Sequence, residues 1–227
     1  MQQALCLQHV PFEGPGVFHP ALTSRQYQFR CCLVPEEDLP QQEPDFLLVM
    51  GGPMSVNDTE HWIQRELRFI RQAIDRDIPT VGVCLGSQFI AKALGGLVKP
   101  GPHLELGPVA ITRTKEGRAD PVFGTFPDRV EVFQWHGEGI SVPPPASPLA
   151  FSEDYPVQAF RYGARVYGLL FHLELEPAGV EALCRECPDD VQQAGTTPEA
   201  LLQAASTIFP QSHELADRLI AHLTRTL

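Results

Sequence analysis

The sequence is poor in positive charge and has no long apolar run. Its 227 residues carry 17 Lys and Arg against 28 Asp and Glu, a formal net charge of −11. This balance argues against a nucleic-acid backbone or an anionic membrane as the main partner, because both attract basic surfaces. No uninterrupted apolar stretch approaches the roughly 18 residues of a membrane-spanning helix. The segment Met1–Leu5 also lacks the basic region of a signal peptide, so we expect a cytoplasmic protein that binds neither nucleic acid nor membrane.

Cysteines are few and irregularly spaced. They stand at positions 6, 31, 32, 84, 184 and 187 without the spacing of a disulfide framework, which fits a reducing cytoplasm. Cys184 and Cys187 form a C-x-x-C with no second pair, so we expect no zinc site and no other metal. Neither G-x-x-x-x-G-K nor G-x-G-x-x-G occurs, so both nucleotide-binding fingerprints are missing. We therefore expect no cofactor.

Strand-like and helical stretches alternate in the first hundred residues. Strands are predicted over 4–10, 27–34, 46–50 and 79–83, and helices over 17–25, 62–74 and 87–94. Asp58 or Thr59 is expected to cap the second of these helices. The run 46–50 is apolar throughout, as in a parallel strand buried on both faces. The pattern predicts an α/β fold, a flavodoxin-like doubly wound, mostly parallel sheet with helices on both faces.

The second half of the chain has a different texture. Residues 98–171 contain short β-like pieces separated by Pro and Gly, which predict a small added antiparallel region. The chain is expected to be helical after Pro177. The last helix has an apolar stripe that we expect to pack on the same core: Leu215, Leu219, Ile220 and Leu223. We predict one domain over 1–190 and a C-terminal helical extension over 191–227 that packs on it.

One turn stands out as a candidate for chemistry. A β-branched strand runs into Gly82-Val83-Cys84-Leu85-Gly86, and a helical stretch leaves it. This is the pattern of a nucleophile elbow, which exposes one side chain above a sheet. A thiol at the start of a helix also feels the positive end of the helix dipole, which favours the thiolate. Cys84 is therefore a candidate nucleophile, although an unpaired cysteine after a strand is also a common core residue.

A second motif supplies a base for this thiol. The strand-like run 165–171 delivers His172 and Glu174, and residues two apart on an extended chain face the same way. The carboxylate can then orient the imidazole, as a thiol nucleophile requires. An isolated H-x-E is more often a surface histidine beside a solvated glutamate. His136 is another candidate base, but its carboxylate partner is less evident.

Two further segments complete the candidate site. Amide hydrogens of the turn Gly51-Gly52-Pro53 can hold a developing oxyanion, together with the amide of Leu85 after the nucleophile. By itself Gly-Gly-Pro is only a turn signal. The segment Trp135-His136-Gly137-Glu138 joins aromatic and polar groups where a strand ends, and it can line a pocket.

The ordered set of motifs resembles the class I, triad-type glutamine amidotransferases from about residue 4 to 190. The segment 82–88 matches the family's G-x-C-x-G-x-Q, 51–53 its oxyanion turn and 172–174 its H-x-E. The segments 135–138 and 13–16 are similar to the stand-alone branch that looks like the amidotransferase domain of GMP synthase. Two positions depart from the usual pattern: Leu173 replaces a common proline, and Glu138 replaces an aspartate.

The resemblance implies a site and a reaction. Cys84 would attack the side-chain amide of glutamine and form a γ-glutamyl thioester, with His172 as base and Glu174 orienting it. Gly52 and Leu85 would form the oxyanion hole. The implied substrate-binding residues are Gly51, Gln88, Trp135, His136 and Gly137. The substrate would be L-glutamine, and a separate synthetase subunit would accept the ammonia, because no synthetase domain accompanies this chain.

Three other functions compete with this interpretation. A γ-glutamyl hydrolase or peptidase would use the same Cys-His-Glu triad and thioester on other γ-glutamyl compounds. An inactive binding or regulatory subunit is less consistent with a complete triad. An intracellular protease of the cysteine-elbow type usually has histidine after the nucleophile, where this chain has Leu85.

Overall fold

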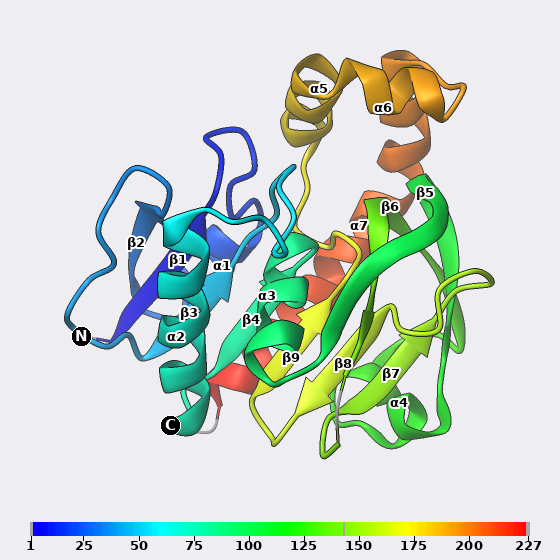
Figure 1. Cartoon of the computed structure of the whole chain (residues 1–227). Coiled ribbons are helices and arrows are strands. Elements are labelled where there is room, and N and C mark those ends of the chain that lie inside the picture. Colours follow the sequence, from blue (N-terminus) through cyan, green and yellow to red (C-terminus); the bar gives the residue numbers. More distant parts are fainter. Residues whose placement is uncertain (1, 143, 226–227) are drawn as a thin grey trace.

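The computed structural model describes residues 2–142 and 144–225, and in these residues nine strands form one sheet (Figure 1). The strand order is β2-β1-β3-β4-β9-β8-β7-β5-β6. One half is parallel and consists of β2 (Gln28–Leu33), β1 (Gln3–Gln8), β3 (Phe46–Val49), β4 (Thr80–Val83) and β9 (Val166–Leu169). This order and direction confirm the predicted doubly wound α/β class.

The other half of the sheet is antiparallel. It contains β8 (Ala159–Tyr162), β7 (Ser147–Phe151), β5 (Leu97–Arg113) and β6 (Arg129–Ser141). The antiparallel addition was predicted, but the expectation of short pieces is wrong for β5 and β6, which have 17 and 13 residues. Their pairing continues across an irregularity between Pro100 and Glu105, where Pro and Gly residues suggested a break.

Helices cover both faces of the parallel half (Figure 1). On one side lie α1 (Phe18–Thr23) and α7 (Pro198–Thr224), and on the other α2 (His61–Asp75) and α3 (Leu85–Ala93). Successive side chains of a strand point to opposite faces of the sheet. In β3, Leu48 packs on the face that α7 covers and Leu47 on the face that α2 covers. Because both faces are buried, the parallel strands are apolar throughout.

Two helix starts differ from the predictions. Helix α2 begins at His61 after an N-cap at Glu60, so neither Asp58 nor Thr59 caps it. The Asp58 carboxylate instead accepts a hydrogen bond from the Ser55 backbone within the preceding turn, at 2.9 Å. Helix α3 begins two residues before the predicted Ser87, because Cys84 is its N-cap.

A third group of helices stands above the carboxyl ends of the strands. It comprises α5 (Pro177–Glu186), α6 (Pro188–Gln193) and the first half of α7, while α4 (Lys115–Ala119) lies at the other end (Figure 1). The second half of α7 packs into the core against the sheet. The division into a domain over 1–190 and an extension over 191–227 stays a prediction. No helix of the described residues is long and apolar enough to cross a membrane.

Candidate active site

Cys84 occupies a strained turn between β4 and α3. Its φ of 49° and ψ of −111° lie outside the regions that residues with side chains prefer. The flanking glycines make the turn sterically feasible: a Cβ on Gly86 would overlap the Val49 carbonyl, and one on Gly82 would overlap Gly86 itself. Helix α3 can therefore start directly against the sheet, with Cys84 held above the strand ends.

Three side chains form a hydrogen-bonded series at this turn. The thiol of Cys84 and the imidazole of His172 are hydrogen-bond partners. The Nδ1 of His172 lies 2.7 Å from Oε1 of Glu174. The backbone N–H of His172 donates to the Phe133 carbonyl at 2.8 Å, which fixes the segment just beyond β9. The structure thus brings together the nucleophile, base and carboxylate that the motifs suggested.

Burial and charge oppose each other in this series. Burial raises the pKa of the Cys84 thiol, while the hydrogen bond and charge of His172 act to lower it. Burial lowers the pKa of His172, but the Glu174 carboxylate and the hydrogen bond to Cys84 outweigh this and raise it well above its usual value. Glu174 therefore makes His172 a stronger base toward the thiol.

The loop 14–17 holds the backbone of Glu174. The N–H of Val17 donates to the Glu174 carbonyl at 3.0 Å. Gly16 has a φ of 46°, and a Cβ there would overlap the same carbonyl. This close approach requires glycine. It gives a structural reason for the Glu13-Gly14-Pro15-Gly16 motif, whose contact with the triad the sequence did not reveal.

The turn after β3 lies beside the nucleophile. A Cβ on Gly51 would be 3.6 Å from Cβ of Cys84, and one on Gly52 would be 2.9 Å from Cδ2 of Leu85. The backbone N–H of Leu85 acts to lower the pKa of the Cys84 thiol. The amides expected to form an oxyanion hole are therefore next to the thiol. Gly51, a predicted substrate-binding residue, is not among the residues that line the cavity described below, and its carbonyl oxygen lies 3.0 Å from Nδ1 of His9.

A cavity of about 520 Å³ opens in front of Cys84. Of the predicted site residues, Gly52, Cys84, Leu85, Gln88, Trp135, His136 and Gly137 line it. Gln88 is buried, and its side-chain Oε1 has no hydrogen-bond partner among the described residues. Gln88 therefore brings an unpaired acceptor to the α3 side of the cavity, the kind of group that an amide NH₂ can satisfy.

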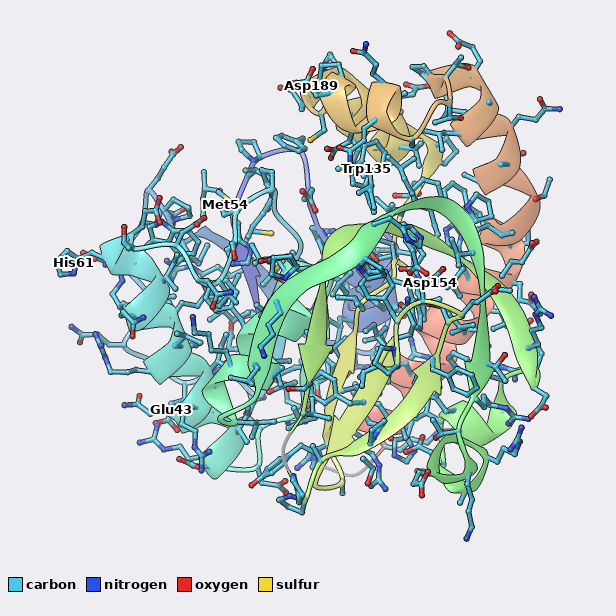
Figure 2. The ribbon with its side chains drawn as sticks, turned by 45° about the vertical axis from the view of Figure 1, so that its right-hand side comes forward. Glu43, Met54, His61, Trp135, Asp154 and Asp189 are labelled. Carbon is cyan, nitrogen blue, oxygen red and sulfur yellow. The ribbon has the colours of Figure 1, made fainter. Side chains whose placement is uncertain are left out.

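Helices α5 and α6 line one side of the cavity through Leu183, Asp190 and Gln193. Figure 2 shows Trp135 beneath these helices, in which Asp189 is labelled. The indole N–H of Trp135 donates to Asp190 of α6 at 2.8 Å, and its carbonyl lies 3.5 Å from the Cys84 sulfur. Trp135 therefore joins the helical cover to the nucleophile. Sequence reasoning did not identify Asp190, whose partner lies on a distant strand.

The cavity wall is acidic. Its carboxylates are Glu13, Glu138 and Asp190, and none of the described lining residues is Lys or Arg. Glu138, which replaces the family's aspartate, accepts a hydrogen bond from the Ser55 hydroxyl at 3.0 Å. Burial raises the pKa of Glu13 to about 7, although the charge of His172 acts to lower it. Glu13 thus titrates near neutrality beside the triad.

His136 has a different set of contacts from His172. Its Nε2 lies 3.1 Å from the Glu105 carboxylate and its Nδ1 is 3.2 Å from the Glu138 carbonyl. Both ring nitrogens thus face groups other than the thiol, whereas His172 is bonded to Cys84. This arrangement favours His172 as the base and gives His136 a place in the cavity wall. The carboxylate partner of His136 was not evident from the sequence.

A buried pair behind the oxyanion turn was also missed. His9 follows β1 and is hydrogen-bonded to the Gly51 carbonyl and the Glu66 carboxylate. The sequence holds a signal for Glu66, because this residue stands at the core-facing spacing of Ile63 and Ile70. In the structure Glu66 is fully buried in α2. No cluster of three potential metal ligands occurs within residues 2–142 and 144–225.

Comparisons with known proteins relate both the sequence and the fold to one family. The sequence model of class I glutamine amidotransferases matches residues 19–182. The glutamine amidotransferase-like protein YfeJ of Salmonella typhimurium is 33% identical over 194 residues, covering 82% of this chain and 81% of that protein. The glutamine-hydrolysing GMP synthase of Thermus thermophilus is 32% identical over 153 residues, which are 66% of this chain and 29% of the synthase. The crystal structure of a glutamine amidotransferase from Thermotoga maritima has a TM-score of 0.90 at 28% identity, covering 99% of both chains.

Proposed function

Because this chain belongs to the class I glutamine amidotransferase family, we propose that it hydrolyses L-glutamine to glutamate and ammonia. Family membership, which the motifs predicted, is confirmed. The observation that carries the reaction is the series Cys84, His172 and Glu174, in which Cys84 lines the cavity and His172 and Glu174 are buried behind it. A thiol with an oriented base is the arrangement that attacks an amide carbon.

The first half-reaction releases ammonia. His172 takes the proton of Cys84, and the sulfur adds to the side-chain carbonyl carbon of glutamine. The imidazolium then gives that proton to the leaving nitrogen, so the C–N bond breaks and NH₃ departs. A γ-glutamyl thioester remains on Cys84. Glu174 stabilises the transient charge on His172, consistent with the 2.7 Å contact between them.

Backbone amides stabilise the tetrahedral intermediate in this proposal. The N–H of Leu85 already acts on the Cys84 thiol by lowering its pKa, and Gly52 lies beside Leu85. Donors placed where negative charge develops are worth roughly 10²–10³-fold in rate for each one. Gln88 lines the cavity and has an unpartnered side-chain oxygen, which in this proposal accepts a hydrogen bond from the substrate. The wall at 135–137 holds the rest of the glutamine.

The second half-reaction consumes water. His172 removes a proton from water, the resulting hydroxide adds to the thioester, and the thiolate leaves and recovers its proton. The products are glutamate and the free enzyme. We place this chemistry in the cytoplasm, because the nucleophile must remain a thiol and all six cysteines are free.

A separate synthetase subunit accepts the ammonia in this proposal. The segment that matches the Thermus thermophilus GMP synthase is 29% of that protein, whose name combines glutamine hydrolysis with synthesis. The present chain matches only part of that protein. In this proposal a second protein carries the acceptor chemistry and completes the transfer.

The test is glutamate release from L-glutamine by the purified protein. Cys84→Ala is expected to lower the rate by at least roughly 10⁴-fold, because the covalent step is lost. Cys31→Ala is the matched control, since Cys31 is an exposed thiol of β2, far along the sheet from the elbow. This control is expected to match the wild type.

Each outcome has a definite meaning. Undiminished release by a folded Cys84→Ala protein contradicts the mechanism. Cleavage of γ-glutamyl peptides without glutamine hydrolysis would replace the proposal with a γ-glutamyl hydrolase. If neither is cleaved, free-standing hydrolysis is wrong, and a pull-down would then seek a partner that activates the site.

A further inference from the structure

The buried pair of His9 and Glu66 lies directly behind the turn that contains Gly51 and Gly52. The Nδ1 of His9 is 3.0 Å from the Gly51 carbonyl oxygen. The Nε2 of His9 lies 3.0 and 3.1 Å from the two oxygens of Glu66 in α2. Both side chains are fully buried. One imidazole thus connects helix α2 to the backbone beside the nucleophile.

We propose that His9 and Glu66 are positioning residues that aim the Gly52 amide at the oxyanion. The proposal rests on the function proposed above and adds two residues to its machinery. Neither touches the cavity, so they act through the Gly51–Gly52 peptide.

Peptide geometry supplies the first argument. In a trans peptide the carbonyl of one residue and the N–H of the next point in opposite directions. Because the Gly51 carbonyl is held toward His9, the N–H of Gly52 must point away from His9. The nucleophile lies near this turn, since a Cβ on Gly51 would be 3.6 Å from Cβ of Cys84. The hydrogen bond from His9 therefore determines where the Gly52 donor points.

The Gly51–Gly52 peptide needs a hydrogen bond to fix its orientation because both residues of the turn are glycine. Glycine visits backbone angles that other residues avoid, so a Gly-Gly peptide can turn over at low cost. A donor that turns away no longer stabilises the oxyanion. The imidazole is itself immobilised: it stacks on Phe89 with ring centroids 5.3 Å apart and planes 1° from parallel. Trp62 lies on it as well, at 5.6 Å.

Hydrogen-bond inventory supplies the second argument. The Gly51 carbonyl can only accept, so Nδ1 of His9 must carry a proton. With a second proton on Nε2, which faces the Glu66 carboxylate, the ring is an imidazolium. Burial lowers the pKa of His9, but Glu66 and the Gly51 carbonyl outweigh this effect and raise it. Glu13, in the loop after β1, raises the pKa of His9 further. A charged donor on the Gly51 carbonyl also polarises the peptide and strengthens the Gly52 N–H as a donor.

A purely structural role explains the pair less well. Replacing a buried ion pair with apolar residues of similar volume is often neutral or stabilising. The core around His9 is aromatic and apolar, with Phe89 and Trp62 against the ring. Packing alone would therefore be served by apolar side chains at both positions 9 and 66.

The test compares His9→Leu with the double variant His9→Asn/Glu66→Gln. Leucine has no donor, while the asparagine amide places an N–H near the position of Nδ1 and leaves no unpaired buried charge. For His9→Leu, kcat for glutamine is expected to fall roughly 10²-fold with little change in KM, the loss typical of one oxyanion donor. The double variant is expected to recover most of that loss. His61→Leu, an exposed histidine of the same α2, serves as the control and is expected to match the wild type.

Two further readouts separate orientation from general damage. Alkylation of Cys84 by iodoacetamide needs the thiolate but no oxyanion hole, so His9→Leu is expected to keep the wild-type alkylation rate. A crystal structure of His9→Leu is expected to show the Gly51 carbonyl turned from its present direction. A carbonyl that keeps its direction overturns the proposal, whether or not the protein hydrolyses glutamine. Absence of hydrolysis in the wild type would instead refute the proposed function, and equal loss in both His9 variants would refute the positioning role.

Discussion

At the residue scale, the reactivity of Cys84 depends on charges that surround a buried thiol. Burial alone would keep the proton on sulfur and make the thiol a weak nucleophile. His172 acts against this by its hydrogen bond and charge, while Glu13 acts with burial. Glu174 sustains the charge on His172. The carboxylates at 13 and 174 therefore have opposite effects on the ionisation of the same sulfur.

Glu174→Gln is expected to leave a weak enzyme. The amide cannot balance the charge that His172 gains, but the nucleophile and base remain. We expect kcat/KM for glutamine to fall roughly 10²-fold, within the range of general acid–base contributions. Steady-state glutamate release at several pH values measures this. A variant equal to the wild type would show that Glu174 is not the orienting group.

Glu13→Gln is expected to make Cys84 more reactive above neutrality. Glu13 loses its proton as the pH rises through about 7, and its charge then faces Cys84, His172, Glu174, His9 and Cys187. Below that pH the carboxyl is neutral and has no effect on the thiol. Above it the negative charge disfavours the thiolate, and glutamine at position 13 removes this charge.

The measurement is the pH profile of iodoacetamide alkylation at Cys84, followed by peptide mass spectrometry. The midpoint for Glu13→Gln is expected to lie lower than that of the wild type by roughly one pH unit. Glu37→Gln, a change on an exposed loop, controls for net charge. Coincident profiles, or a shift to higher pH, would show that Glu13 does not act on the thiol by its charge.

The residues that sequence reasoning could find are those whose partners are close in the chain. His172 and Glu174 are two residues apart, and Cys84 can be recognised by the glycines two positions before and after it. His9 and Glu66 are separated by 57 positions, and their contact depends on how α2 packs against the end of β1. The spacing of apolar residues in this segment shows only that Glu66 is a charged residue on an apolar helix face. It does not predict that the partner of Glu66 is His9.

At the element scale, the elbow depends on how closely α3 approaches the sheet. The Gly86 backbone lies against the Val49 and Met50 carbonyls, so no side chain fits there. Gly86→Ala is expected to displace α3, abolish activity and lower the free energy of unfolding by several kcal/mol, on the order of an overpacked core. Thermal unfolding and glutamate release measure the two effects.

Gly179→Ala in α5 provides the comparison for this prediction. The added methyl meets only the flexible end of Leu175, which can move aside. Alanine also has a higher helix propensity than glycine, by about 1 kcal/mol. This variant is expected to remain as stable as the wild type. A Gly86→Ala protein with equal stability and activity would contradict the steric account of the elbow.

Element lengths were harder to predict in the antiparallel half. In β5 the segment Pro100-Gly101-Pro102 interrupts the period-two pattern and resembles a loop. The strand nevertheless continues, because β6 pairs with it on both sides of the irregularity. Gly101 also accommodates the ring of Tyr155, which a Cβ would overlap. Pairing with a distant strand thus overrode a local signal.

At the scale of the whole molecule, helix α7 connects two parts of the core. Its first half packs Leu201, Ala205 and Ile208 under the cover of the cavity. Its second half packs Leu215 and Leu219 against the sheet. The sequence predicted this second contact from the apolar stripe. The helices beside the candidate active site therefore rest on the same helix that covers one face of the sheet.

Overall charge bears on which γ-glutamyl compounds the protein accepts. The chain has a net charge of −11, and the cavity wall contributes three carboxylates without Lys or Arg among its described residues. Such a field repels anions, and the effect weakens as salt shortens the screening length. Glutamine is net neutral near pH 7, whereas γ-glutamylglutamate is an anion. We therefore expect a lower kcat/KM for γ-glutamylglutamate than for glutamine, by at least roughly 10-fold at low salt.

Measuring both substrates from about 10 mM to 500 mM NaCl tests this account, because the screening length falls over that range from about 30 Å to less than 10 Å. As the salt concentration rises, kcat/KM for glutamine is expected to change little, while kcat/KM for γ-glutamylglutamate rises. The ratio of the glutamine value to the γ-glutamylglutamate value therefore falls. Glu138→Gln and Asp190→Asn are expected to narrow the ratio further at low salt, since each removes a charge from the wall. A preference for the anion at low salt would contradict the electrostatic argument and favour γ-glutamyl peptide hydrolysis, because only a site without this repulsion could select the more negative substrate.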